Sequence, residues 1–192
     1  MKTAIIIHGM PSKKEYFNSA SPSQSNKHWI PWIQKHLILN GILAQTPEMP
    51  EPYAPHYEKW KEIFEQFKVN EDTVLVGHSC GAGFLVRWLS ENKVKVGKVV
   101  LVAPWTNTEE DYSMGIQQTF FKFNIDKDLV SRTAGFKIMY SLDDEKYILD
   151  TVDLLKANIK NAEFQEFKDK GHFVFGSMHT EEFPELLNNI VI

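Results

Sequence analysis

The sequence predicts an α/β fold, in which about six parallel strands form one sheet that is covered by helices on both faces. Six short apolar stretches are rich in β-branched residues, and amphipathic stretches lie between most of them. This alternation of strand and helix is typical of a parallel sheet with right-handed helical crossovers. The six expected strands are Ala4–Ile7, Ile42–Gln45, Thr73–Val76, Val96–Val102, Phe136–Tyr140 and Ala162–Phe167.

Local signals define the elements between these strands. The first helix, His28–Leu39, has Pro31 in its first turn, where proline is tolerated, and the Asn-Gly pair that follows it ends the helix. Residues 46–56 contain four prolines and are expected to form a loop. Thr106–Lys122 has no clear period and is expected to be an insert. The other expected helices are Tyr57–Phe67, Gly81–Ser90, Asp126–Arg132, Tyr147–Ile159 and Glu181–Ile190.

Length, charge and cysteine content restrict the class of protein. A chain of 192 residues can bury a full core, and we expect a single domain over residues 1–192. The formal net charge of −4 and the absence of a basic run argue against nucleic acid as a partner. The lone cysteine, Cys80, allows neither an internal disulfide nor a cysteine-based metal cluster. With no signal-peptide pattern and no apolar run of membrane-spanning length, we expect a cytoplasmic protein, either a monomer or a weak homodimer.

The most informative stretch is Gly77-His78-Ser79-Cys80-Gly81, which follows a strand and precedes a helix. It matches the pattern G-x-S-x-G in the strand–turn–helix context that a nucleophilic serine requires. The turn is so tight that its flanking positions leave no room for side chains, and the two glycines satisfy that need. The turn also presents the serine at a helix N-terminus, which favours developing negative charge. Ser79 is therefore the candidate nucleophile.

A serine hydroxyl needs a neighbouring base, and the candidate is His172. In folds of this type the partners follow in the order serine, acid, histidine. His172 follows the sixth expected strand, and Gly171 before it allows a sharp loop. His8 precedes the serine, the side chain of His78 should point away from the turn, and His179 remains a second candidate.

The acid is expected after the fifth strand, where Asp143 and Asp144 are adjacent. One carboxylate should accept a hydrogen bond from the imidazole and fix its tautomer. Asp144 is favoured because an apolar pair that begins a helix follows it at the right distance. Asp143 is the alternative, and it can also cap the N-terminus of that helix.

Two backbone N–H groups should form an oxyanion hole. The residue after the nucleophile, Cys80, supplies one through its backbone, and a functional thiol there is a further possibility. The loop His8-Gly9-Met10-Pro11 supplies the other, because Gly9 permits close approach and the N–H of Met10 is the expected donor. This machinery requires neither a metal nor a cofactor.

These motifs together resemble an α/β-hydrolase. The short chain is similar to the small serine hydrolases of the retinoblastoma-binding protein 9/YdeN type, which have a minimal α/β-hydrolase fold and a Ser-Asp-His triad. The resemblance extends over the whole chain, and its specific parts are the Gly-His-Ser-x-Gly-Ala and Asp-Asp…Gly-His-Phe elements. It implies esterase-like activity, with Ser79, Asp144 and His172 as the triad. Lys146-Tyr147-Ile148-Leu149 departs from relatives that carry a proline after the acid.

The expected function is cleavage of a small-molecule acyl ester by a carboxylesterase-like serine hydrolase. Thioesterase or amidase activity would use the same groups, and a hydrolase-fold protein can instead act as a protein-interaction module. The short insert leaves no room for a large cap, so we expect an exposed site. Substrate-binding candidates are Trp29, Trp105 and Phe173. Other aromatic residues that could line the pocket or belong to the core are Trp32, Tyr112, Phe120, Phe121 and Phe123.

Overall fold

A computed structural model of the chain describes residues 1–106 and 119–192. Its centre is a sheet of six parallel strands in the spatial order β2-β1-β3-β4-β5-β6, which confirms the predicted α/β class. All six expected strands are present, with boundaries shifted by at most three residues. Their bounds are β1 Thr3–Ile7, β2 Leu43–Gln45, β3 Thr73–His78, β4 Val96–Val102, β5 Thr133–Ser141 and β6 Glu163–Phe167.

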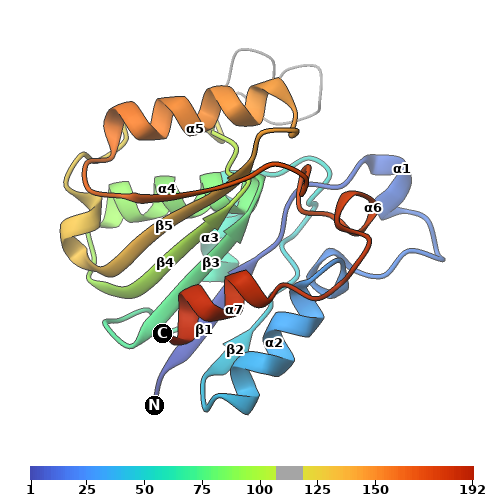
Figure 1. The fold of residues 1–192 in the computed structure, drawn as a ribbon, viewed down its shortest axis with the longest axis horizontal. Helices are drawn as coiled ribbons and strands as arrows, with labels where there is room; N and C mark the ends of the chain where they lie inside the picture. The colour runs from blue at the N-terminus through green and yellow to red at the C-terminus, as the bar shows by residue number, and fades with distance from the viewer. Residues whose placement is uncertain (107–118) are drawn as a thin grey trace.

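Helices cover both faces of the sheet (Figure 1). One face carries α3 (Tyr57–Phe64), α4 (Cys80–Asn92) and α5 (Lys146–Asn158), and the other carries α2 (Ile30–Leu39) and α7 (Pro184–Val191). The central strands of a parallel sheet that is covered on both faces are largely apolar and buried. The central strand β3 is accordingly buried at all six of its positions.

Three predicted helices differ from the observed ones for local reasons. The expected helix at Asp126–Arg132 is only a 3-10 helix, Leu129–Arg132, because the Asp126 side chain accepts the N–H of Asp128 in a turn. The last helix begins at Pro184 rather than at Glu181, since proline fits the first helical turn. The helix predicted over Tyr57–Phe67 ends at Phe64. Two four-residue helices lie outside the predicted helices, namely α1 (Lys13–Tyr16) and α6 (Phe175–Met178).

The topology brings the candidate residues to one edge of the sheet. His8 and His78 stand at the carboxyl ends of β1 and β3, and the loops after β5 and β6 carry Asp144 and His172. Because all strands run in the same direction, these ends meet at a single edge, which is where open α/β sheets bind ligands.

Candidate active site

The turn between β3 and α4 places Ser79 in a backbone conformation that few residues adopt. Its φ is 54° and its ψ is −123°, a combination that L-residues avoid outside functional sites. Close packing of the backbone around the turn maintains this conformation. A Cβ atom on Gly77 would lie 2.5 Å from the Cα of Ala82, and one on Gly81 would lie 2.4 Å from the carbonyl oxygen of His8. The glycine requirement predicted from the sequence thus has a direct steric cause.

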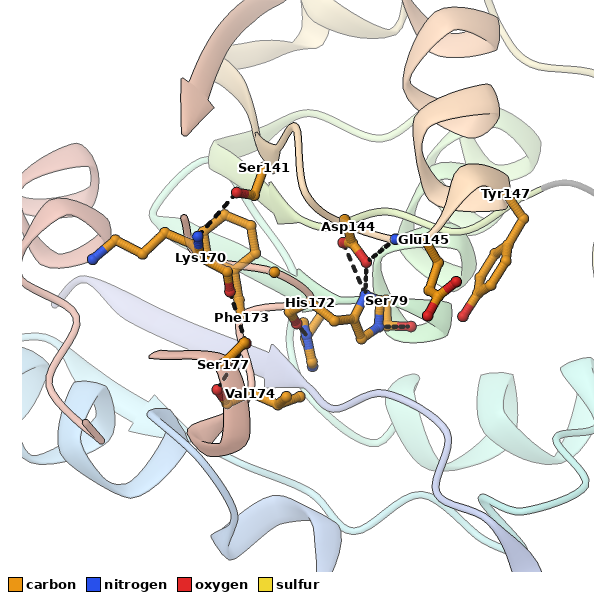
Figure 2. Close-up of polar contacts among 12 residues, drawn as sticks. Ser79, Ser141, Asp144, Glu145, Tyr147, Lys170, His172, Phe173, Val174 and Ser177 are labelled. Atoms are coloured by element: carbon orange, nitrogen blue, oxygen red, sulfur yellow. Dashed lines mark hydrogen bonds and ion pairs between the residues drawn. The ribbon is translucent and has the colours of Figure 1, made fainter. Parts of the chain in front are cut away.

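Ser79, His172 and Asp144 form a continuous chain of hydrogen bonds (Figure 2). The Nε2 atom of His172 lies 3.0 Å from the Oγ of Ser79, and its Nδ1 lies 3.0 Å from both carboxylate oxygens of Asp144. The Asp144 side chain is 1% exposed and that of His172 is 25% exposed. A buried carboxylate can act only as an acceptor, so Nδ1 carries the proton and Nε2 presents its lone pair to the serine hydroxyl.

Asp143 has a different task from its neighbour. Its Oδ1 accepts hydrogen bonds from the hydroxyl of Ser141 and from the N–H of Gly171, the residue before His172. The bond from Ser141 is the main reason why the pKa of Asp143 is lowered. The prediction that Asp143 caps helix α5 was wrong, since Glu145 occupies the cap position and makes no side-chain capping bond. Asp143 instead joins the loop after β5 to the loop after β6.

The loop that carries His172 is fixed by contacts on both sides. Gly171 and Phe173 have positive φ values of 48° and 54°, so the chain makes a sharp turn around the histidine. The Nε2–H of His78 donates to the carbonyl oxygen of His172 at 2.8 Å. Ser177 donates its hydroxyl to the carbonyl of Lys170 (Figure 2). The sequence analysis assigned no role to His78 or Ser177, and only the position of His78 next to the nucleophile could have suggested one.

The loop after β1 lies directly against the nucleophile. A Cβ on Gly9 would lie 3.0 Å from the Cβ of Ser79 and 3.3 Å from the Nδ1 of His78. Met10 follows Gly9 and lines the cavity around Ser79, while Cys80 begins helix α4 with a fully buried side chain. Met10 and Cys80 thus lie next to the nucleophile in the structure, and the assignment of their backbone N–H groups to an oxyanion hole stays a prediction.

Two cavities open from the nucleophile, and Ser79, His172, Met10 and Pro11 line both of them. The small cavity measures about 240 Å³, and the large cavity measures about 650 Å³. Polar side chains that line the small cavity include Glu15, Gln24, His28 and His78. The large cavity is walled mainly by the aromatic and apolar side chains of Tyr53, Ala54, Trp105 and Tyr147.

The aromatic residues predicted to bind substrate fall into two groups. Trp105 lines the large cavity. Trp29 and Phe173 line neither cavity, because both are fully buried and the indole Nε1–H of Trp29 donates to the carbonyl of Phe173. Trp29 and Phe173 therefore belong to the core, and their assignment as pocket residues is corrected. Tyr112 lies outside the described residues, and Trp32, Phe120, Phe121 and Phe123 pack in or against the core.

Burial keeps the two inner histidines of the site neutral. Desolvation lowers the pKa of His78 well below its usual range, and the neighbouring His172 acts in the same direction. Desolvation also lowers the pKa of His8, whose Nδ1–H donates to the carbonyl of Gly9 and whose Nε2 accepts the N–H of Met49. His8 thus uses both ring nitrogens to fasten the loop after β1 to the proline-rich loop 46–56.

Neither a metal centre nor a membrane span is visible in residues 1–106 and 119–192. No group of three or more histidine, cysteine, aspartate or glutamate side chains there is arranged to hold a metal ion. None of the helices in these ranges is both long and apolar enough to cross a bilayer.

Comparison with known proteins gives a consistent assignment. YdeN of Bacillus subtilis (strain 168) is 25% identical over 167 residues, which cover 85% of this chain and 87% of YdeN. Serine hydrolase RBBP9 of Rattus norvegicus is 23% identical over 164 residues, which cover 83% and 82% of the two chains. The crystal structure of the B. subtilis ydeN gene product matches with a TM-score of 0.80 at 24% identity and covers 98% of this chain and 96% of that one.

The solved structures to which this chain is similar identify the fold as that of an α/β-hydrolase. The resemblance predicted from the motifs is thereby confirmed at the level of fold. The family model "Serine hydrolase" matches residues 20–190, and this chain therefore belongs to the serine hydrolase family.

Proposed function

We propose that the protein is a carboxylesterase-like serine hydrolase that cleaves small acyl esters through an acyl-enzyme on Ser79. The observation that carries the proposal is the unbroken chain from the Ser79 hydroxyl through His172 to the buried carboxylate of Asp144. A neutral imidazole in this position takes a proton from the hydroxyl and is stabilised as an imidazolium by the carboxylate.

In the first half of the reaction, the Oγ of Ser79 attacks the ester carbonyl carbon while its proton moves to the Nε2 of His172. The carbonyl π electrons move to oxygen, and the backbone N–H groups of Met10 and Cys80 stabilise this oxyanion. The tetrahedral intermediate then expels the alcohol, which takes the proton from His172. The acyl group remains as an ester of Ser79.

In the second half, water attacks the acyl-enzyme carbonyl and gives one proton to the Nε2 of His172. Collapse of the second tetrahedral intermediate releases the carboxylic acid, and the proton on His172 returns to Ser79. The exposed fraction of His172 and the open cavities on either side of Ser79 give water access to the acyl-enzyme. A water-accessible site favours hydrolysis over transfer of the acyl group to another acceptor.

The test combines a nitrophenyl ester assay with labelling by a fluorophosphonate. We expect wild-type protein to hydrolyse p-nitrophenyl butyrate and to be labelled on Ser79, and Ser79→Ala to lose both properties, with hydrolysis reduced about 10⁴-fold or more. The matched control is Ser131→Ala, which removes an exposed hydroxyl at the opposite edge of the sheet. It should behave as wild type.

The outcome separates the proposal from its alternatives. If the folded wild-type protein acquires no adduct on Ser79, it is an interaction module that retains the hydrolase fold. If Ser79 is labelled but thioesters or amides are cleaved faster than matched oxygen esters, the triad is retained and the ester preference is withdrawn.

A further inference from the structure

The small cavity beside Ser79 contains polar groups that the reaction itself does not use. Its lining includes the nucleophile, His172 and the loop after β1, together with Gln24 and His28. Buried polar groups in proteins are normally hydrogen-bonded, so groups that lack a protein partner and face a cavity indicate a ligand or ordered water there.

His28 provides a hydrogen-bond donor to this cavity. Its backbone has a φ of 56°, and its Nδ1 accepts the N–H of Phe175 at 3.1 Å. Burial lowers the pKa of His28, which keeps the ring neutral. The single ring proton therefore sits on Nε2, which has no hydrogen-bond partner in residues 1–106 and 119–192.

His78 provides an acceptor. Its Nε2–H is committed to the carbonyl oxygen of His172, so its Nδ1 carries a lone pair. This residue is 4% exposed and lines the small cavity next to Gly9. Within the part of the chain that the structure describes, no donor reaches Nδ1.

Gln24 provides both kinds of group through its side-chain amide. The residue is 7% exposed and its side chain makes no hydrogen bond to any described residue. Its backbone is firmly held, because Glu48 accepts the N–H groups of Gln24 and Ser25 at 3.1 and 2.8 Å. Gln24 is thus held by its backbone at the wall of the small cavity, and its side chain is largely shielded from bulk solvent.

The charges around the small cavity are neutralised within the protein. Glu15 is the only carboxylate among its described lining residues, and it accepts the ammonium of Lys27 at 2.6 Å. Lys27 is itself 7% exposed, so the lysine of this ion pair is largely shielded from solvent. A charged ligand would have to compete with the pair or remain uncompensated, and both are costly in a confined site.

We propose that the small cavity binds the alcohol portion of the ester, and that it selects a compact uncharged group with both hydrogen-bond donors and acceptors, such as a primary carboxamide. This inference deepens the proposed function and rests on it. Ser79 and His172 line both cavities, so an ester carbonyl at their junction directs its two substituents into different cavities. The large cavity, with Trp105, Tyr147 and Ala54, suits an apolar acyl chain.

The dimensions agree with a small alcohol. A volume of about 240 Å³ corresponds to roughly eight water molecules at their share of liquid volume, which accommodates a group of a few heavy atoms and not a sugar chain or a peptide. A group that bonds His28, His78 and Gln24 would leave none of the three unpaired, whereas an apolar group of the same size would leave all three without partners.

The experiment compares three hexanoate esters that differ only in the alcohol. Glycolamide and isobutanol have the same number of heavy atoms and differ in the polar amide, and choline supplies a cationic alcohol. We expect wild-type protein to prefer the glycolamide ester over the isobutyl ester, in kcat/KM, by at least tenfold beyond their ratio in alkaline hydrolysis. Gln24→Met should reduce this preference about tenfold, mainly by raising KM for the glycolamide ester.

Two further variants make the test specific. His28→Asn removes the Nε2 donor while keeping a residue that tolerates positive φ, and it should also reduce the preference about tenfold. It serves as an independent test if Gln24→Met fails to fold. Gln66→Met makes the same chemical change as Gln24→Met at an exposed site and should leave the preference at the wild-type value.

Three results would overturn the inference. The first is equal preference for the glycolamide and isobutyl esters after correction for alkaline hydrolysis. The second is a preference for the choline ester that Gln24→Met does not alter. The third is a preference that persists in both Gln24→Met and His28→Asn. If no hexanoate ester, p-nitrophenyl hexanoate included, is cleaved in a Ser79-dependent way, the proposed function fails as well.

Discussion

The nucleophile turn and the loops that carry Asp144 and His172 meet at one site but are stabilised in opposite ways. Residues 77–83 are buried throughout and are fixed by backbone contacts so close that all three of their glycines leave no space for a Cβ. The loops after β5 and β6 are partly exposed and are fixed by hydrogen bonds that involve side chains, chiefly those of Ser141, Asp143 and Ser177. The serine is positioned by packing, and its partners are positioned by a polar network.

This difference predicts how each region responds to mutation. The turn cannot accommodate an added Cβ at Gly77, Gly81 or Gly83, because the nearest atom that it would meet belongs to the backbone. Loss of a polar partner in the loops leaves the fold intact and lets the histidine move relative to the serine. Mutations in the turn should therefore mainly lower the free energy of unfolding, and mutations in the loops should mainly lower kcat.

The largest expected effect is that of Asp144→Asn. An asparagine amide cannot serve as the charged acceptor for Nδ1–H, so the imidazole loses its preferred tautomer and the imidazolium loses its stabilising charge. We expect kcat for p-nitrophenyl butyrate to fall about 10⁴-fold, with little change in the free energy of unfolding. The control is Asp153→Asn, the same change at an exposed position of α5. Full activity in Asp144→Asn would remove Asp144 from the mechanism.

The turn is tested by Gly83→Ala, in the first turns of helix α4. A Cβ there would lie 2.0 Å from the carbonyl oxygen of Trp105 and 2.6 Å from the ring of Phe121. We expect a loss of about 3 kcal/mol in the free energy of unfolding, measured by urea denaturation. Gly176→Ala in helix α6 is the matched control, because a Cβ there meets nothing within 4 Å. Equal stability of the two variants would contradict the packing argument.

The same difference explains what could be predicted from the sequence. Ser79 and its glycines were identified because a steric requirement is local and leaves a fixed spacing in the chain. The position of His172 followed from strand order, and the structure brings it to Ser79. The choice between Asp143 and Asp144 stayed open, because the contacts that distinguish them come from Ser141, Gly171 and the imidazole, which only the folded chain brings together.

The pocket was the least predictable part. Aromatic residues near strand ends suggested its wall, yet Trp29 and Phe173 complete the core instead, since a large apolar side chain is stabilised by any buried environment. Gln24 and His28 were not considered for the small cavity, because no spacing in the sequence marks a loop residue that folds back beside the nucleophile. The expectation of a single domain stays a prediction.

The buried histidines around the site predict a loss of stability in mild acid. The pKa values of His8, His28 and His78 are lowered by burial, so in the folded protein these rings stay neutral where the unfolded chain, at about 6.5, takes up protons. Stability is therefore fully present above pH 6.5 and falls as the pH decreases below it. Between pH 6.5 and 5.5 the loss due to His78, whose pKa is lowered well below its usual range, should be roughly 1 kcal/mol, and His8 and His28 should add to it in the same direction.

Urea denaturation at pH 7.5, 6.5 and 5.5 measures this dependence. His78→Gln removes one of these titrating rings and should reduce the loss by roughly 1 kcal/mol, while the exposed His179→Asn should leave it unchanged. A free energy of unfolding that is flat over this range would mean that the buried rings are as easily protonated in the folded protein as in the unfolded chain.

The smallest expected effect is that of Asp143, which acts on the reaction only through the loop that carries His172. Asp143→Ala removes the acceptor of the Gly171 N–H, so the imidazole should sample positions away from Ser79, and we expect kcat to fall about tenfold with KM nearly unchanged. Asp143→Asn keeps an oxygen that can accept this bond, and it should recover most of kcat. Recovery would show that the geometry of the loop matters and not the charge. If Asp143→Asn is instead as slow as Asp143→Ala, the effect comes from the negative charge beside the histidine. That result would weaken the contrast between Asp144, which orients the base, and Asp143, which only holds the loop that carries it.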